Sequence, residues 1–179
     1  LGARIELARI DQPKSNTTPQ LPAPLVAEVK DWSQRMDREV SDGYERQAII
    51  TAAAHYQGQA GLWADSDALL KSNLAKSHSP YYLMSQLGGN AKKLGKKDEA
   101  VNWYQQAYDK SVGPATRLQW GAGYVTNLVE LTPQDAPRIE KAVQAVIADA
   151  AKDKNAFYDR SARSMQRIDA AIEADVAQF

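Results

Sequence analysis

The sequence predicts an all-α fold, in which antiparallel helix pairs stack into an array that a C-terminal helix caps. Three observations predict it. Alanine is abundant while clusters of Val, Ile and Thr are few, which favours helices over strands. Apolar residues recur at helical spacing over nearly all of the chain from Leu25 onward. Small and apolar positions also return at a step of 34 residues, as stacked helix pairs require.

The first segment predicts a short helix followed by a strap. Residues 1–11 have the pattern of the end of an amphipathic helix, as if the chain were entered midway through a longer protein. Its expected apolar side carries Ile5, Leu7, Ala8 and Ile10. Four prolines then follow in the polar stretch "DQPKSNTTPQLPAP", and proline both fixes φ and removes a donor. We expect residues 1–24 to be this helix end plus a strap or linker, and residues 25–179 to be the helical domain.

The next segment, "LVAEVKDWSQRMDREV", predicts one amphipathic helix that "SDGY" at 41–44 ends. Its expected apolar face carries Leu25, Val29, Trp32, Met36 and Val40.

The 34-residue recurrence then organises the middle of the chain. Gly61 and Gly95 are related by this step, as are Pro80 and Pro114. A small residue lets two helices cross closely, and a glycine lets the first helix of a pair end in a left-handed cap. Three series of three members follow the same step: Ala54, Gly88 and Ala122; Ile50, Met84 and Leu118; Ala60, Leu94 and Leu128.

The middle unit, "YYLMSQLGGNAKKLGKKDEAVNWYQQAYDKSVGP", resembles a tetratricopeptide repeat (TPR). The residues that carry this resemblance are Leu87, Gly88, Gly95, Ala100, Tyr104 and Ala107, with a proline closing the unit. The flanking units are degenerate, because Ser66 stands where alanine is expected and Val129 replaces the turn glycine. In the unit that follows the middle one, the turn comes later in the sequence, with Thr132 as the expected N-cap and Pro133 at the first helical position.

A last helix is expected at about 154–177, where it would cap the array. Its expected apolar residues are Phe157, Tyr158, Met165, Ile168, Ala171, Ile172 and Val176.

Composition and motifs exclude several classes of function. The formal net charge is 0, which argues against a nucleic-acid or anionic-membrane binder, and no run of about 18 apolar residues predicts a membrane span. The chain has no cysteine, so it carries no thiol chemistry or thiolate metal site. His55 and His78 stand apart from any ligand cluster, and "QLGGNAKKLGKK" lacks the Gly-Lys-Ser/Thr ending of a phosphate loop. We therefore expect no catalytic residue, metal or cofactor, although an enzyme of unknown type is a third possibility.

The stretch "GPATRLQWGAGYV" is denser in glycine than a plain repeat requires. Gly121 and Gly123 inside a helix would each cost up to about 1 kcal/mol relative to alanine. That cost indicates close approach of another helix or of a ligand, with helix packing the favoured reading.

Three stretches resemble the helical C-terminal region of bacterial cell-envelope thioredoxin-like proteins. They are "YERQAIITAAAHYQGQAGLWADSDALL", "SHSPYYLMSQLGGNAKKLGKKDEAVNWYQQAY" and "GPATRLQWGAGYVTNLVELTPQD", within residues 30–150. The resemblance implies a periplasmic or envelope location, and a role in recruiting substrate proteins or organising an N-terminal thioredoxin-like domain. No redox residue carries over, since the Cys-x-x-Cys centre belongs to that other domain.

We therefore expect a non-catalytic module that binds a protein or an extended peptide. The alternative is a structural or dimerisation extension that packs on the thioredoxin-like domain. A step of 34 residues along the first helix of each pair predicts a polar, partly basic groove. Tyr82 would be its large aromatic side chain, and Lys92 and Lys93 would contact acidic groups of the bound peptide. The last helix or the strap filling this groove is an equal expectation. The expected groove residues are Thr51, His55, Gln59, Tyr82, Ser85, Lys92, Lys93, Gln119 and Asn127.

Overall fold

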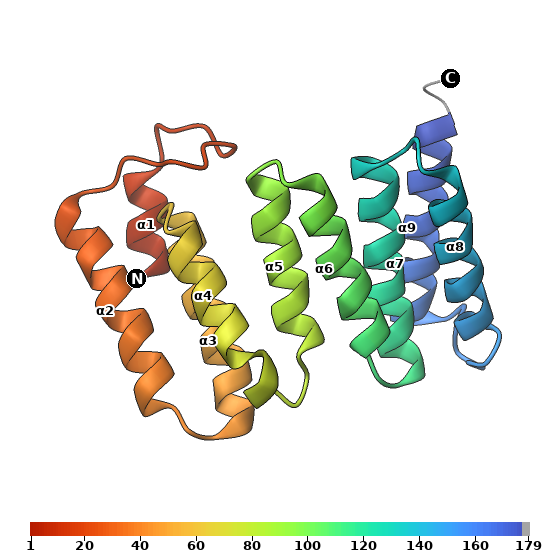
Figure 1. Cartoon of the computed structure of the whole chain (residues 1–179), viewed down its shortest axis with the longest axis horizontal. Coiled ribbons are helices and arrows are strands. Elements are labelled where there is room, and N and C mark those ends of the chain that lie inside the picture. The colour runs from red at the N-terminus through yellow and green to blue at the C-terminus, as the bar shows by residue number, and fades with distance from the viewer. Residues whose placement is uncertain (177–179) are drawn as a thin grey trace. The chain divides into compact units, whose positions relative to one another are not determined.

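The computed structural model describes residues 1–176, and over that range the chain forms nine α-helices, one short 3₁₀ helix and no β-strand (Figure 1). The all-α prediction is therefore confirmed. Residues 177–179, which the expected last helix and helical domain include, lie outside the described part. The helices form two compact units that divide after Lys96. The expected boundary between 24 and 25 stays a prediction.

The first unit contains five α-helices in which consecutive long helices pack on each other. α3 contacts α2, α4 and α5, and α4 also contacts α5. The short α1 packs on α3, and its Ile5 joins Leu25, Val29 and Ala60 in one buried cluster. The elements are α1 (Gly2–Ala8), α2 (Ala23–Glu39), α3 (Gly43–Gln59), α4 (Trp63–Asn73), the 3₁₀ helix η1 (Leu74–Lys76) and α5 (Tyr81–Lys93).

The second unit is organised around α7, which contacts every other helix of that unit. Its elements are α6 (Lys97–Lys110), α7 (Pro114–Leu131), α8 (Ala136–Ala150) and α9 (Asp159–Val176). Leu118, Ala122, Val125 and Leu128 of α7 are all fully buried. A helix that is buried on most sides needs apolar residues around most of its circumference, as this one has.

The 34-residue step corresponds to a repeated backbone turn. Gly61 and Gly95 have φ of 77° and 73°, in the left-handed region that glycine tolerates. The preceding residues, Ala60 and Leu94, share φ and ψ to within a degree. In each turn the residue after the glycine donates its N–H to a carbonyl five residues back, as a Schellman cap does. The same cap therefore ends α3 and α5.

The predicted small and apolar series are largely buried. Ala54 and Ala122 are 0 % exposed, and Gly88 is also buried. Ile50, Met84 and Leu118 are buried as well, whereas Leu94 is 37 % exposed because it lies in the turn after α5. Ser66, which departs from the repeat pattern, is fully buried, donates to the Ala54 carbonyl at 2.9 Å and accepts from Asn90 at 2.9 Å.

Arg46 joins three helices of the first unit, close to the point where α2 ends and α3 begins. Arg46 of α3 donates to the Asp37 and Val40 carbonyls at the end of α2. It also pairs with the Asp37 carboxylate and donates to Asn73 Oδ1 of α4 at 2.6 Å. Carbonyls at a helix C-terminus lack partners within the helix, so Arg46 satisfies them while it fixes how the three helices meet.

The structure confirms the close helix packing that we predicted at Gly121, but not at Gly123. A Cβ built on Gly121 would lie 2.6 Å from Val146 Cγ2 and 3.0 Å from Tyr108 Cε2, so α6 and α8 both approach α7 there. A Cβ on Gly123 would have no neighbour within 4 Å.

Three details of the sequence prediction are wrong. In α1 Ile5 is buried, but Leu7, two positions further and therefore on the opposite side of the helix, is 67 % exposed, and Ile10, beyond the end of the helix, is 73 % exposed. Thr132 closes α7 by bonding back to Leu128, and Asp135 caps α8 instead, because its carboxylate accepts from the Arg138 N–H. The last helix begins at Asp159, so Phe157 and Tyr158 lie in the preceding loop and are exposed.

Candidate functional site

The candidate site lies along the seam between α3 and α5 of the first unit. These two helices lie side by side in the first unit, and both also pack on α4. Gln86 Nε2 of α5 donates to the Thr51 carbonyl of α3 at 3.1 Å. Further along both helices, Gln59 and Lys93 line one common hollow. The two helices therefore run in the same direction, with residues about 34 apart facing each other.

A shallow hollow of about 450 Å³ opens on this seam. Tyr82 is its most prominent aromatic side chain, at 44 % exposed, and its ring centroid lies 5.0 Å from that of Tyr81. On the α3 side, the exposed His55 lies 5.8 Å from the ring of Tyr56, which in turn packs on Trp32. We name this hollow the seam groove; its lining residues are Thr51, Ala52, His55, Tyr56, Tyr82, Ser85 and Gln86.

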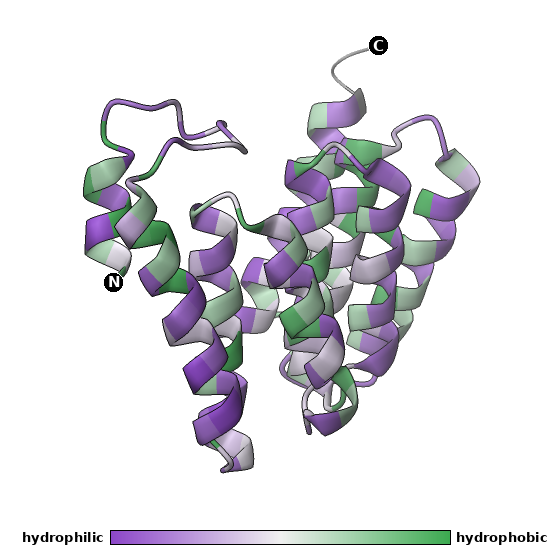
Figure 2. Cartoon of the chain, turned by 60° about the vertical axis from the view of Figure 1, so that its left-hand side comes forward, coloured by the Kyte–Doolittle hydropathy of each residue, from purple (hydrophilic) through white to green (hydrophobic). Residues whose placement is uncertain are grey.

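A second hollow of about 590 Å³ lies at the far end of the same seam, beneath the segment that connects α1 to α2. We call residues 9–22 the strap, and Figure 2 shows it as predominantly hydrophilic. This strap hollow combines Arg9 and Lys14 with Gln59 at the end of α3 and Lys93 at the end of α5. Glu6, Ile10 and Gln12 complete its lining.

The structure brings together part of the predicted groove. Thr51, His55, Tyr82 and Ser85 line the seam groove, and Gln59 and Lys93 line the strap hollow. Lys92 is half-buried and lines neither of these two hollows. Gln119 and Asn127 belong to α7 of the second unit, where Asn127 Nδ2 donates to the Gly123 carbonyl at 2.8 Å.

Sequence reasoning missed several lining residues. Gln86 lies one position beyond the 34-residue register, and Tyr56 directly follows His55, so a wider window around each position would have found both. Arg9 and Lys14 come from the strap, whose path over α3 no periodicity encodes.

The polar contacts of the second unit form a structural cluster. Asp149 of α8 accepts from Tyr108 OH of α6 at 2.6 Å and from Arg117 Nε of α7 at 2.8 Å. The Arg117 guanidinium also lies 4.6 Å from the centre of the Tyr108 ring, a cation–π geometry. Each charged or polar group of this cluster already has a partner, so the cluster holds three helices together.

The electrostatics of this cluster follow from burial and pairing. Burial raises the pKa of Tyr108 to about 12, with further contributions from its hydrogen bond to Asp149 and from the negative charge of that carboxylate. Burial alone would raise the pKa of Asp149, but the hydrogen bonds from Tyr108 and Arg117 outweigh it and lower this pKa below its ordinary value. Tyr108 is therefore a neutral donor at neutral pH, not a general base.

A third hollow, of about 530 Å³, lies on the second unit. Its apolar side chains include Ile147 of α8, Met165 of α9 and Phe157 of the loop between those helices. Ile147 and Phe157 are 53 % and 72 % exposed.

Within residues 1–176, no three His, Cys, Asp or Glu side chains are grouped so that they could hold a metal ion. No helix in the described part is both long and apolar enough to cross a bilayer. Comparison with known proteins found no matching family model, no matching curated protein and no matching solved structure. The geometry of the chain itself must therefore support any assignment of function.

Proposed function

We propose that this chain is a non-catalytic protein-interaction module that binds an extended peptide in the seam groove. The observation that carries the proposal is an exposed aromatic side chain, Tyr82, beside small polar groups in one hollow. Binding surfaces commonly combine an aromatic side chain, which contributes much of the affinity, with polar groups that fix orientation. Thr51 and Ser85 supply hydroxyl groups, and His55 supplies an exposed imidazole.

The dimensions of the seam suit an extended peptide. Thr51 and Gln59 are eight residues apart on α3, which corresponds to about 12 Å along a helix axis. An extended chain advances about 3.3 Å per residue, so roughly four peptide residues span this distance. A folded partner domain would need a larger contact surface than this hollow offers.

The wider biological context is part of the same proposal. In the first unit α3 and α5 both pack on α4 and run parallel to each other, and this arrangement supports a TPR-like reading of that unit. The resemblance of Ser79-Pro80-Tyr81-Tyr82 and Gly113-Pro114 to envelope thioredoxin-like proteins supports a periplasmic substrate-recruiting role beside a redox domain.

A second candidate is a structural or dimerisation extension, and exposed apolar side chains favour it. Leu7 and Ile10, at the end of α1 and just beyond it, are 67 % and 73 % exposed. Burying them against a neighbouring domain would be favourable by roughly 25 cal/mol per Å² of apolar surface. Replacing Leu7, which lines neither the seam groove nor the strap hollow, with serine should weaken that association and leave peptide binding in the seam groove unchanged.

Selection from a random dodecapeptide library displayed on phage tests the proposed function. We expect the wild-type chain to enrich binding sequences, and the double variant Tyr82→Ala, Ser85→Arg to lose them, because it removes the aromatic ring and fills the hollow with a charged side chain. A matched control is Tyr158→Ala, Ser72→Arg, which changes an exposed tyrosine and an exposed serine elsewhere.

Circular dichroism and the urea midpoint establish that each variant is folded. Equal enrichment by the folded seam-groove variant would contradict the proposal, as would loss of enrichment in the control alone.

A further inference from the structure

We infer that the strap hollow is a carboxylate-binding site, and that it receives an acidic group of the peptide bound in the seam groove. This inference rests on the proposed function for the peptide, whereas its anion chemistry follows from the strap hollow alone. Four observations support it: the hydrogen bonds that hold the strap, the cations that line the hollow, the balance of charge, and the continuity of the two hollows.

The strap forms one wall of the strap hollow, and hydrogen bonds hold it in place. Trp63 Nε1 of α4 donates to the Thr17 carbonyl at 2.6 Å. Gln12 donates to the Gln20 carbonyl at 2.8 Å and accepts from the Gln20 N–H at 3.0 Å, which closes the strap into a loop. Pro19 lies against Gly61 so closely that a Cβ there would be 3.0 Å from it. The strap is therefore docked on the turn between α3 and α4.

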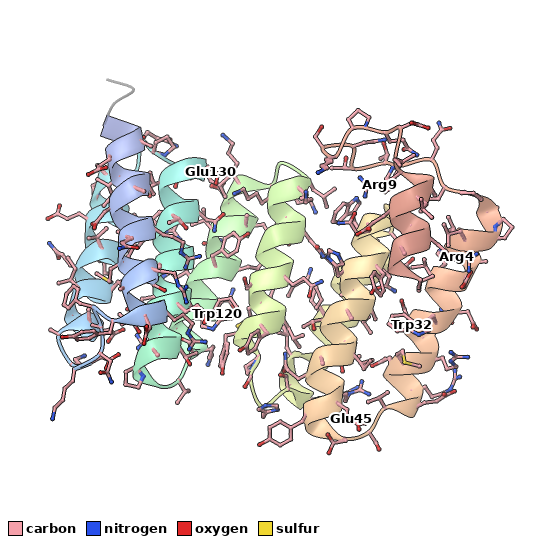
Figure 3. The ribbon with its side chains drawn as sticks, turned by 180° about the vertical axis from the view of Figure 1, so that it is seen from behind. Arg4, Arg9, Trp32, Glu45, Trp120 and Glu130 are labelled. Carbon is pink, nitrogen blue, oxygen red and sulfur yellow. The ribbon has the colours of Figure 1, made fainter. Side chains whose placement is uncertain are left out.

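Arg9 joins this wall to the end of α3. Its guanidinium donates to the Gln59 carbonyl at 2.8 Å, to Gln59 Oε1 at 2.7 Å and to the Asn16 carbonyl at 3.0 Å. Figure 3 shows Arg9 where α1 meets the strap. Because Arg9 already has these partners, it positions the wall and contributes its charge, and other side chains must contact the ligand.

Lys14 and Lys93 are the side chains that can do so. Both line the hollow, both are exposed, and neither has an ion-pair partner within the described residues 1–176. One comes from the strap and the other from the end of α5, so a bound carboxylate would be held from two sides. Gln59 adds an amide that can donate to the same group.

The net charge around the strap hollow favours the binding of an anion, although two negative contributions oppose this binding. Glu6 also lines the hollow, and the C-terminal ends of α3 and α5 each contribute about half a negative charge. The three cations Arg9, Lys14 and Lys93 outweigh these negative charges and leave a net charge of roughly +1 at the site. Arg9 further weakens the opposing field of α3, because it binds the Gln59 carbonyl directly.

The two hollows follow each other along one seam. On α3, Thr51 and His55 line the seam groove, and Gln59, one turn beyond His55, lines the strap hollow. On α5, Gln86 lines the first and Lys93, two turns further, lines the second. Tyr82 and Lys93 lie about 16 Å apart along α5, so an extended peptide with its aromatic or apolar part by Tyr82 would place a group about five residues away at the strap hollow.

Titration with glutarate, followed by amide and lysine side-chain NMR shifts of the full chain, tests the anion chemistry. We expect saturable shifts at Lys14 and Lys93, a response to inorganic phosphate at the same residues, and none with glutaramide, which has the same shape without charge. The double variant Lys14→Gln, Lys93→Gln should weaken glutarate binding about fivefold or more, since two exposed ion pairs are lost. The control Lys141→Gln, Lys154→Gln makes the same change in net charge at exposed lysines elsewhere.

Equal binding of glutarate and glutaramide, or equal weakening in both lysine variants, would overturn the carboxylate site. In the phage selection, enrichment of acidic residues at one end of the binding sequences supports the inference. Binders without such enrichment would leave the proposed function standing and remove the inference. A carboxylate site without any peptide binders would remove the proposed function together with the peptide as the source of the carboxylate, and would leave only the anion site. A response to phosphate only, without glutarate, would also overturn the carboxylate assignment.

Discussion

The faces that follow the 34-residue register differ between the two units. In the first unit, α3 and α5 present Thr51 and Ser85 along a hollow. In the second unit, the position one step beyond Ser85 is Gln119 of α7, and Arg167 of α9 donates to the Gln119 carbonyl at 3.4 Å. The second unit instead concentrates close packing and a polar cluster around α7. The same 34-residue register therefore lines a hollow on the first unit and, at Gln119, meets an arginine of α9 on the second.

The largest expected effect on stability distinguishes a close-packed position on α7 from an open position on the same helix. Gly121→Ala should destabilise the protein by about 1–3 kcal/mol, because its Cβ would lie 2.6 Å from Val146 Cγ2. Gly123→Ala is the matched control, since nothing lies within 4 Å of its Cβ. It should stabilise by about 0.5–1 kcal/mol, because alanine favours the helix. Urea unfolding of both variants checks the pair; an equal sign for both would contradict the packing described here.

A second prediction concerns pH and the polar cluster of the second unit. Because the pKa of Asp149 is lowered in the folded chain, its contribution to stability is complete above about pH 4 and is lost as pH falls through the folded pKa. The raised pKa of Tyr108 acts oppositely, so its contribution is lost as pH rises from about 10 toward 12.

The measurement for this prediction is the urea midpoint of wild type and Asp149→Asn between pH 2 and pH 8. At pH 7 the variant should be less stable by about 1–3 kcal/mol, since hydrogen bonds to a charged group are lost. The gap should narrow as pH falls below about 4, the ordinary pKa of an aspartate, and through the lowered pKa of Asp149. Lys152→Gln, which removes only an exposed partner of Asp149 at 3.4 Å, should change little. A gap that does not depend on pH would contradict the role of the carboxylate.

The smallest expected effect concerns the strap. Trp63→Phe removes the hydrogen bond from the indole to the Thr17 carbonyl and should cost about 0.5–1.5 kcal/mol. Amide hydrogen exchange should accelerate in residues 16–20 while exchange in α7 stays unchanged, because the two belong to different units. Unchanged exchange in the strap would mean that Trp63 does not hold it.

Much of the fold was predictable because it depends on local sequence patterns. The glycines at 61 and 95 mark identical caps, since few other residues adopt φ near 75° at low cost. The start of α9 was not predictable from spacing. Phe157 and Tyr158 fit a helical period, yet they lie in a loop in which only Ala156 is fully buried. Likewise Thr132 and Asp135 are both good caps, but the Thr132 hydroxyl bonds back to the Leu128 carbonyl and Asp135 caps α8.

The candidate site was predictable only in part, for a related reason. The register placed Thr51, His55, Tyr82 and Ser85 on neighbouring helices, and these four line the seam groove. It could not show that Arg167 of α9 reaches the Gln119 carbonyl of α7, nor that the strap folds over the end of α3. Both depend on contacts between segments far apart in sequence, which no local pattern specifies.

The most direct test of the central claim is chemical-shift mapping of a library-selected peptide on the isotopically labelled chain. The claim predicts that the largest shifts fall in residues 51–59 of α3 and 82–93 of α5, and that the hollow between α8 and α9 does not respond. Shifts concentrated around Ile147 and Phe157 instead, with the α3–α5 seam unaffected by a bound peptide, would contradict it.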